Sequence, residues 1–266
     1  MSESHDRRAL LATCVAAAVK AAEVVRTGAA QLDTLAWESK GPSDFVSRVD
    51  RDAEAVLSAV ILERHPDAGI MAEEGSPRAE SREVLFVADP LDGTTNFLHG
   101  FPWYAVSIGV LVHGEPEAAA VLNVANGELF TAARGSGARR NGQPIKVSAV
   151  SDPSRALVGT GFPFKHREGV APYMEVLPRL MRTTAGLRRA GSAALDLCDV
   201  ACGRYDAFWE YRLAPWDVAA GILITREAGG VVTDLDGAPA TVAHGPIVAG
   251  NPVMHAWLLE QLMVDG

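Results

Sequence analysis

The chain has 266 residues, of which 48% are hydrophobic and 21% charged, and its formal net charge is −9. This length and apolar content suit a globular protein with a well-buried interior. The acidic balance argues against non-specific nucleic-acid binding, which requires a basic surface, so a phosphate-bearing ligand needs positive charge supplied locally.

The N-terminal segment combines a basic pair, an apolar run and a cysteine, as a secretory or lipoprotein signal does. Apolar residues nevertheless recur every three or four positions from Leu10 to Val25, with Lys20 and Glu23 between them, which predicts an amphipathic helix. Apolar runs shorter than the roughly 18 residues of a membrane span predict no membrane association. The cysteines have no zinc-like spacing, and their apolar contexts predict buried thiols in a reducing, cytoplasmic setting: Cys14, Cys198 and Cys202.

Two acids precede the middle of the chain. A loop is predicted at residues 39–44, and a helix follows whose apolar face includes Ala53–Ile61. Asp50 stands at the start of this helix, where an aspartate commonly serves as the N-cap. A short strand, Ala68–Ala72, ends in Glu73, and an acid after a strand usually lies on the solvated surface. Each acid alone therefore has an ordinary structural explanation.

Paired acids then follow a buried strand, predicted at Leu85–Ala88. Pro90 biases Asp89 toward an extended backbone, so Asp89 should leave the strand end and point into a cleft. The turn Asp92–Thr95 could open a helix whose backbone N–H groups face an anion. Carboxylates repel a phosphate, so a site that uses both needs divalent cations between them. The alternative is a structural turn, in which Asp, Pro and Gly are common.

The rest of the chain changes character near residue 150. Before it, strands are predicted at Ala105–Val112, Glu117–Val124 and Glu128–Ala133, joined by Asn-Gly turns into a largely antiparallel sheet. After it, strands and helices alternate, and Asp217 stands at the start of a helix. We therefore expect one unit, residues 1–266, with an N-terminal lobe at 1–150 and a C-terminal α/β lobe at 151–266.

Acids thus recur at strand ends or helix starts in four separate places: Asp50, Glu73, the pair Asp89 and Asp92, and Asp217. A hard divalent cation requires several oxygen ligands, and one strand cannot supply them all. Their joint placement predicts a shared metal site.

On these residues the chain resembles the inositol monophosphatase family, and in particular the bacterial inositol-1-monophosphatases. The match spans four segments: Ser43–Asp50, Ala72–Glu74, Asp89–Phe97 and Trp216–Gly221. Two further segments are similar to the inositol phosphatase branch: Thr160–Lys165 and Gly191–Leu197. The resemblance implies an α/β (α+β) fold built as a layered αβαβα sandwich. It also implies Mg²⁺-dependent hydrolysis of inositol 1-phosphate by a metal-activated water.

The resemblance implies two to three Mg²⁺ ions per active site. The first would be held by Glu73, Asp89 and the carbonyl of Leu91. The second would be held by Asp89, Asp92 and Asp217. A third, weaker ion would involve Glu73 and, partly through water, Asp50.

The phosphate and the nucleophile receive roles by the same resemblance. The backbone amides of Gly93 and Thr94 would grip the phosphate. The attacking water would be oriented by Glu73 and Thr94, with Thr94 itself positioned by Asp50. A dianionic phosphate repels its nucleophile, so metal charge on the phosphate oxygens is required.

Substrate choice is expected to rest on groups beyond the phosphate. The resemblance implies that Glu210 accepts hydrogen bonds from ring hydroxyls, and an acid there suits a small phosphorylated polyol. The loop expected against the ring consists of Gly191, Ser192 and Ala193. Arg188 or Arg189 either contacts substrate or serves a dimer or surface role.

Several alternatives remain open at this point. Shared metal ligands do not specify the alcohol, so histidinol phosphate, fructose 1,6-bisphosphate or adenosine 3',5'-bisphosphate could be the substrate. The chain could instead be a regulatory protein that binds partners. A nucleotide-binding oxidoreductase is disfavoured because no glycine fingerprint follows a strand and opens a helix. The resemblance also suggests a homodimer and inhibition by Li⁺.

Overall fold

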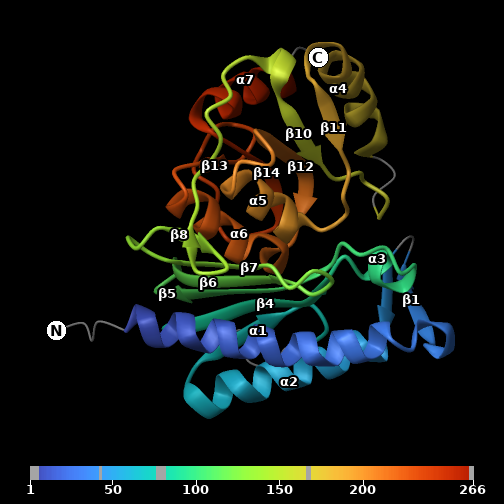
Figure 1. The fold of residues 1–266 in the computed structure, drawn as a ribbon, viewed down its shortest axis with the longest axis vertical. Helices are drawn as coiled ribbons and strands as arrows, with labels where there is room; N and C mark the ends of the chain where they lie inside the picture. Colours follow the sequence, from blue (N-terminus) through green and yellow to red (C-terminus); the bar gives the residue numbers. More distant parts are fainter. Residues whose placement is uncertain (1–5, 42–43, 76–81, 166–168, 264–266) are drawn as a thin grey trace.

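The computed structural model describes residues 6–41, 44–75, 82–165 and 169–263. Ser43, the first residue of one similar segment, lies outside them. The described residues form five layers (Figure 1). Helices make three of these layers, in this order: α1 (Arg7–Ala29) with α2 (Arg48–Arg64), α5 (Ala193–Ala201) with α6 (Pro215–Glu227), and α4 (Val170–Thr183) with α7 (Pro252–Leu262). A sheet lies between each pair of helical layers, which confirms the predicted layered αβαβα architecture.

The first sheet has seven strands in the order β3-β4-β5-β6-β7-β8-β9. Only the pair β3 and β4 is parallel, which agrees with the largely antiparallel sheet predicted for this half. The strand bounds are β3 (Gly69–Ala72), β4 (Val84–Asp92), β5 (Ala105–Val112), β6 (Glu115–Asn123), β7 (Leu129–Ala133), β8 (Ala138–Arg140) and β9 (Gln143–Pro144).

The second sheet has five strands in the order β11-β10-β12-β14-β13. Their bounds are β10 (Leu157–Thr160), β11 (Gly186–Arg188), β12 (Ala207–Leu213), β13 (Val231–Thr233) and β14 (Gly245–Gly250). Strand β10 is parallel to both β11 and β12, whereas β14 is antiparallel to its neighbours. The two sheets fall on either side of residue 150, but α6 contacts strands of both, so the division into lobes stays a prediction.

Smaller elements complete the described chain. Strands β1 (Trp37–Gly41) and β2 (Asp44–Ser47) pair antiparallel, so the loop predicted across residues 39–44 is wrong at its two ends. Side chains of β1 are exposed, so no apolar alternation marks this strand in the sequence. Helix α3 (Thr94–Leu98) is short, and two 3₁₀ turns are present: η1 (Leu32–Thr34) and η2 (Pro153–Arg155).

The N-terminal segment forms the predicted amphipathic helix. In α1 the buried residues are mostly small, including Ala17, Ala18, Ala21 and Ala22, and they let the helix pack closely on α2 and on the first sheet. All three cysteines are free: Cys14 and Cys198 are buried, and Cys202 is half-buried. The prediction of buried thiols is therefore confirmed for Cys14 and Cys198, whereas Cys202 is only partly buried.

Close packing of α6 brings its start beside the first sheet. A Cβ added to Gly109 of β5 would lie 2.9 Å from the Cβ of Ala219, and one added to Gly221 would lie 2.4 Å from Leu197 of α5. Only glycine fits at such distances, so the backbone of Gly109 packs directly on Ala219 and that of Gly221 directly on Leu197. The N-terminal turn of α6 is therefore held next to β4.

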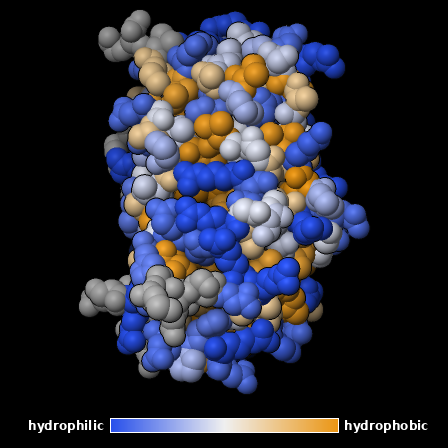
Figure 2. Space-filling view, turned by 90° about the vertical axis from the view of Figure 1, so that its left-hand side faces the viewer, coloured by the Kyte–Doolittle hydropathy of each residue, from blue (hydrophilic) through white to orange (hydrophobic). Residues whose placement is uncertain are grey.

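The surface mixes polar and apolar residues. On the face that Figure 2 shows, hydrophilic residues cross the middle, and hydrophobic residues lie in small groups above and below. Across residues 6–263, apart from the three undescribed gaps, no helix has the length and apolar content needed to cross a bilayer.

Candidate active site

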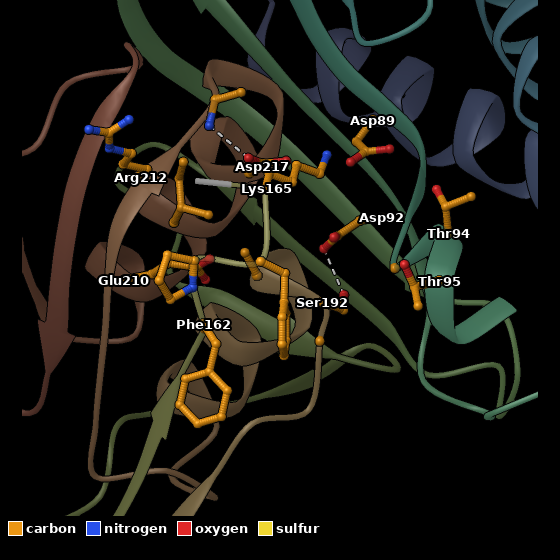
Figure 3. Close-up of a pocket in the computed structure, with 18 of the residues that line it drawn as sticks. Asp89, Asp92, Thr94, Thr95, Phe162, Lys165, Ser192, Glu210, Arg212 and Asp217 are labelled. Atoms are coloured by element: carbon orange, nitrogen blue, oxygen red, sulfur yellow. Dashed lines mark hydrogen bonds between the residues drawn. The ribbon is translucent and has the colours of Figure 1, made fainter. Parts of the chain in front are cut away.

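A cavity of about 1110 Å³ opens where the two sheets and the central helices meet. Its wall is built by the end of β4, the start of α3, the segment after β10, the start of α5, the end of β12 and the start of α6. Figure 3 shows acidic side chains at its centre, with Thr94 and Thr95 on one side and Glu210 and Phe162 on the other. The predicted site segments, distant in sequence, therefore share one cavity.

Three acids come together on this wall. Carboxylate oxygens of Asp89, Asp92 and Asp217 lie within 4.8 Å of one another, the first two residues being buried and the third half-buried. Two of these acids come from β4 and one from α6, so the cluster joins separate parts of the chain.

An irregularity in β4 explains how two of the acids face the same way. The strand continues to Asp92, so the predicted end at Ala88 is wrong. Asp89 pairs with Ser107 of β5 and Asp92 with Ala105, so two residues of β4 stand opposite one of β5. In a regular strand, positions three apart point to opposite faces, and one extra residue restores a common side. The bulge thus directs Asp89 and Asp92 into the cavity together.

Each acid of the cluster has one oxygen held by the protein. Asp89 Oδ1 accepts the Leu91 N–H at 2.9 Å, and Asp217 Oδ2 accepts the Ala214 N–H at 2.7 Å. Asp92 Oδ2 accepts the Ser192 hydroxyl at 2.7 Å and the Ala194 N–H at 2.8 Å. These bonds orient the carboxylates, which keeps their geometry preorganised for a ligand.

The electrostatics of the cluster favour a bound cation. Burial, and then the charges of Glu73, Asp92 and Asp217, hold the pKa of Asp89 well above its usual range. Burial and the charge of Asp92 raise the pKa of Asp217 to about 8. Like charges this close disfavour joint ionisation unless a positive charge lies between them. Three carboxylates with hard oxygen donors therefore fit a divalent cation such as Mg²⁺.

Glu73 lies in the same cavity but outside the 4.8 Å group among the described residues. Its carboxylate is 3.7 Å from Lys40 Nζ, and the neighbouring Glu74 pairs with the same lysine. Its charge raises the pKa of both Asp89 and Asp217, so Glu73 interacts electrostatically with the cluster. Lys40 also lines the cavity, and the sequence analysis missed it because nothing in an exposed strand distinguishes this lysine.

Asp50 reaches the cavity through Thr94. It is buried at the third position of α2, where its Oδ2 accepts both the N–H and the hydroxyl of Ser47, at 2.9 and 2.7 Å. The N-cap is therefore Ser47, and the N-cap interpretation of Asp50 is wrong. The second oxygen, Oδ1, accepts the Thr94 hydroxyl at 3.0 Å. The same hydroxyl lies 3.0 Å from the carbonyl oxygen of Leu91.

The turn before α3 requires glycine at residue 93. Gly93 is the N-cap of α3 with φ of 93°, a conformation that L side chains rarely adopt. A Cβ there would also lie 3.0 Å from the carbonyl oxygen of Trp103. Both Gly93 and Thr94 line the cavity.

Glu210 lies across the cavity from the threonines (Figure 3). Burial, and then the charge of Asp217, raise its pKa to about 8. The predicted loop lies at the wall too, and Ser192 caps α5 by accepting the Leu195 N–H at 3.4 Å. Its members are Gly191, Ser192 and Ala193.

The two arginines of the prediction lie in different places. Arg188 is exposed, and its guanidinium donates to the carbonyl of Leu187 at 2.9 Å. Arg189 lines the cavity and lies 4.9 Å from the ring centroid of Phe164. A substrate role for Arg188 stays a prediction, and the geometry favours Arg189.

Other cavity residues had no assigned role in the sequence analysis. Asp196 is 1% exposed, and no hydrogen-bond partner of its Oδ1 is found in the described chain. Tyr173 packs against Tyr211 and Phe162, with ring centroids 4.6 and 5.9 Å apart. Asp196 lies within the similar segment Gly191–Leu197, which was the available signal, whereas Tyr173 stands out only by its contacts.

Comparison with known proteins gives a consistent result. The family model described as "Inositol monophosphatase family" matches residues 6–263. A Pseudomonas aeruginosa protein named "Nus factor SuhB" is 44% identical over 247 residues, covering 91% of each chain. The structure of extragenic suppressor protein suhB from Bartonella henselae superposes with a TM-score of 0.93 at 41% identity, covering 97% of this chain and 100% of that one. Inositol monophosphatase from Anabaena gives 0.84 at 39% identity, covering 96% of each chain.

Proposed function

The chain belongs to the inositol monophosphatase family, and on that premise we propose that it is a Mg²⁺-dependent phosphomonoesterase that hydrolyses inositol 1-phosphate to inositol and phosphate. One observation carries the proposal. Three acids from β4 and α6 meet in a cavity whose opposite wall presents Glu210. One side of the cavity can therefore bind a phosphate whose charge is balanced by metal ions, and the opposite side can bind a leaving group with several hydroxyls.

We assign two metal positions on the family resemblance, and the cluster of Asp89, Asp92 and Asp217 supports the second of them. Glu73, Asp89 and the carbonyl of Leu91 would hold one ion, and Asp89, Asp92 and Asp217 the other. Glu73 with Asp50 would support a weaker third. When bound, Mg²⁺ supplies positive charge that neutralises the phosphate oxygens, acidifies a water molecule and stabilises the leaving oxygen.

Thr94 is positioned to orient the nucleophile. Its hydroxyl has one proton, and both Asp50 Oδ1 and the carbonyl oxygen of Leu91 lie 3.0 Å from the oxygen; we assign the proton to Asp50 because a carboxylate is the stronger acceptor. A lone pair of the same oxygen is then available to accept a hydrogen bond from the attacking water. Glu73 would orient that water from the other side. The Gly93 and Thr94 amides would hold the phosphate so that attacking and leaving oxygens stay in line.

Glu210 would select the alcohol. A cation that balances the charge of Asp217 would favour the ionised form of Glu210. A carboxylate accepts hydrogen bonds but donates none, so it favours substrates whose ring hydroxyls point at it. A site built to bind a hydroxyl rejects analogues that lack one, because its own polar group is then left unpaired. The loop Gly191–Ala193 and the side chain of Arg189 would bound the ring.

Phosphate release from a panel of monoesters tests this function. We expect inositol 1-phosphate to be hydrolysed with Mg²⁺ and not after chelation, faster than histidinol phosphate, fructose 1,6-bisphosphate or adenosine 3',5'-bisphosphate. A different preferred substrate would keep the phosphatase class and overturn the inositol assignment. No Mg²⁺-dependent release from any ester would overturn both.

Three further expectations rest on the family and stay proposals. The enzyme would be a homodimer, act in the cytoplasm and be inhibited by Li⁺. Light scattering of the purified chain tests the first, fractionation of the source cells the second, and the same panel with added LiCl the third.

The name of the Pseudomonas aeruginosa relative favours a second candidate, in which this chain acts as a Nus factor through a partner-binding surface. Replacement of the native gene by Asp89→Asn separates the two candidates. If the variant rescues a strain that lacks the native gene, the cellular role lies in partner binding. If it does not, although the variant is folded and present at normal levels, the role requires hydrolysis.

A further inference from the structure

Gly161 lies beside Glu210, and the carboxylate of Glu210 fills the space that a side chain at residue 161 would need. The parallel register of β10 and β12 pairs Val158 with Ala207 and Thr160 with Trp209, so the next residue, Gly161, adjoins Glu210. A Cβ added to Gly161 would lie 2.0 Å from both Cδ and Oε2 of Glu210 and 2.2 Å from Oε1. Non-bonded atoms do not approach this closely, so the acid packs directly on the glycine backbone.

The backbone itself does not demand glycine at residue 161. Two other glycines of the cavity, Gly93 and Gly191, have φ of 93° and 92°, where any side chain is strained. Gly161 is not among the residues with positive φ, so an alanine fits its backbone. The three heavy atoms nearest to an added Cβ all belong to Glu210, so the lack of a side chain matters most at that contact.

The glycine is also held in place on both sides. The buried Thr160 donates its hydroxyl to the Gly161 carbonyl at 3.1 Å. The next residue, Phe162, packs edge-on against Tyr173, with ring centroids 5.9 Å apart. Glu210 is attached to β12, which has partners on both sides. If a methyl group were added at residue 161, the glutamate side chain would rotate rather than either backbone move.

We propose that Gly161 is a positioning residue for substrate recognition: its bare backbone sets the direction in which Glu210 presents its carboxylate to a polyol hydroxyl. This inference rests on the proposed function, in which Glu210 selects the alcohol. A side chain at residue 161 displaces the carboxylate and misaligns that hydrogen bond. None of the three heavy atoms nearest to an added Cβ belongs to an acid of β4 or α6, so we expect the handling of the phosphate to be preserved.

Kinetics of Gly161→Ala on two substrates test the proposal. Inositol 1-phosphate has ring hydroxyls, whereas phenyl phosphate has none. We expect KM for inositol 1-phosphate to rise about tenfold, as for one lost hydrogen bond, with kcat/KM for phenyl phosphate within about twofold of the native value. Gly41→Ala is the matched control, because Gly41 also lacks a positive φ, a Cβ there meets no heavy atom within 4 Å, and the residue does not line the cavity.

A double variant shows whether the effect passes through Glu210. Glu210→Ala removes both the hydroxyl acceptor and the clash, so adding Gly161→Ala to it should change KM little. The proposal would be overturned if the increases in KM caused by the two single substitutions multiplied in the double variant. It would also be overturned if Gly161→Ala had the native KM for inositol 1-phosphate, or if it lost kcat/KM equally on both substrates. If Gly161→Ala fails to fold, folding of the double variant still supports the contact, and failure of both overturns it.

The experiment also separates this inference from the function beneath it. Native enzyme that hydrolyses neither substrate refutes the proposed function. If the native enzyme prefers inositol 1-phosphate, and this preference is lost in Glu210→Ala but kept in Gly161→Ala, only the role of Gly161 is refuted.

Discussion

The acids of the cavity and Glu128 lie in contrasting surroundings in this protein. In the cavity, Asp89 and Asp92 take hydrogen bonds from backbone amides and a serine hydroxyl, and lie among other acids. Between the first sheet and the end of α5, Glu128 instead takes hydrogen bonds from both terminal nitrogens of Arg204, and Arg140 lies 3.7 Å away.

The pKa of Glu128 moves in the opposite direction to the pKa values of the cavity acids. Hydrogen bonds from Arg204 lower the pKa of Glu128 below its ordinary value. Burial raises the pKa of Asp92, and burial with neighbouring acids raises that of Asp89. An acid whose charge is already balanced by arginine serves the fold, because its pairing is complete without a ligand. Acids crowded together keep unbalanced charge that a cation can use.

The largest effect is expected when one acid of the cavity loses its charge. Asp89→Asn keeps the shape of the side chain but removes a charged ligand shared by both proposed ions. We expect kcat to fall by about 10³-fold or more in Mg²⁺ while the fold is kept, as checked by phosphate release and circular dichroism. Near-native turnover would remove Asp89 from the metal site.

Loss of the Thr94 hydroxyl comes next. Thr94→Ala removes the oxygen that Asp50 positions, and we expect kcat to fall about 10²-fold with little change in KM. Thr94→Ser, which keeps the hydroxyl, should recover most of that loss. If serine and alanine were equally impaired, the role of Thr94 would be packing and not proton positioning.

The stability of the metal-free protein should depend on pH in a direction set by the cavity acids. Glu210 and Asp217 have pKa values of about 8 in the folded chain, above their ordinary 4.5 and 3.8. Between these values the folded state binds more protons than the unfolded state, so the free energy of unfolding falls as pH rises. We expect Tm in EDTA to drop on the order of 5 °C from pH 5.5 to 8.5.

Two comparisons sharpen that measurement. Glu210→Gln should show a shallower fall, because one of the titrating groups is gone. Saturating Mg²⁺ should raise Tm most at high pH, where the acids are ionised and bind it best. A metal-free Tm that is flat or rises across this range would contradict the raised pKa values.

The smallest expected effect lies at the arginine-paired acid. Glu128→Gln weakens a charged hydrogen-bond pair that links the first sheet to the end of α5, and we expect the free energy of unfolding to fall by about 1 kcal/mol. Because Glu128 is remote from the cavity lining, kcat/KM should stay native. Denaturant titration and phosphate release measure the two quantities. A tenfold loss of activity would show that the two acid groups are coupled.

Local features of this protein were determined by the sequence alone. The three-and-four spacing of α1, the glycine before α3 and the proline that opens α6 each act within a few residues, so their elements could be predicted from the chain. The acids of the cavity were predicted as a set for the same reason, since each stands at or near the end of a strand or the start of a helix.

Only the tertiary structure decided how these residues meet. The bulge that turns Asp89 and Asp92 to one side depends on pairing with β5, and the approach of Asp217 depends on how α6 packs on that sheet. The same holds for Gly161, whose contact with Glu210 arises from the register of two strands distant in sequence. Register and packing are settled by many long-range contacts together, which no local stretch of sequence contains.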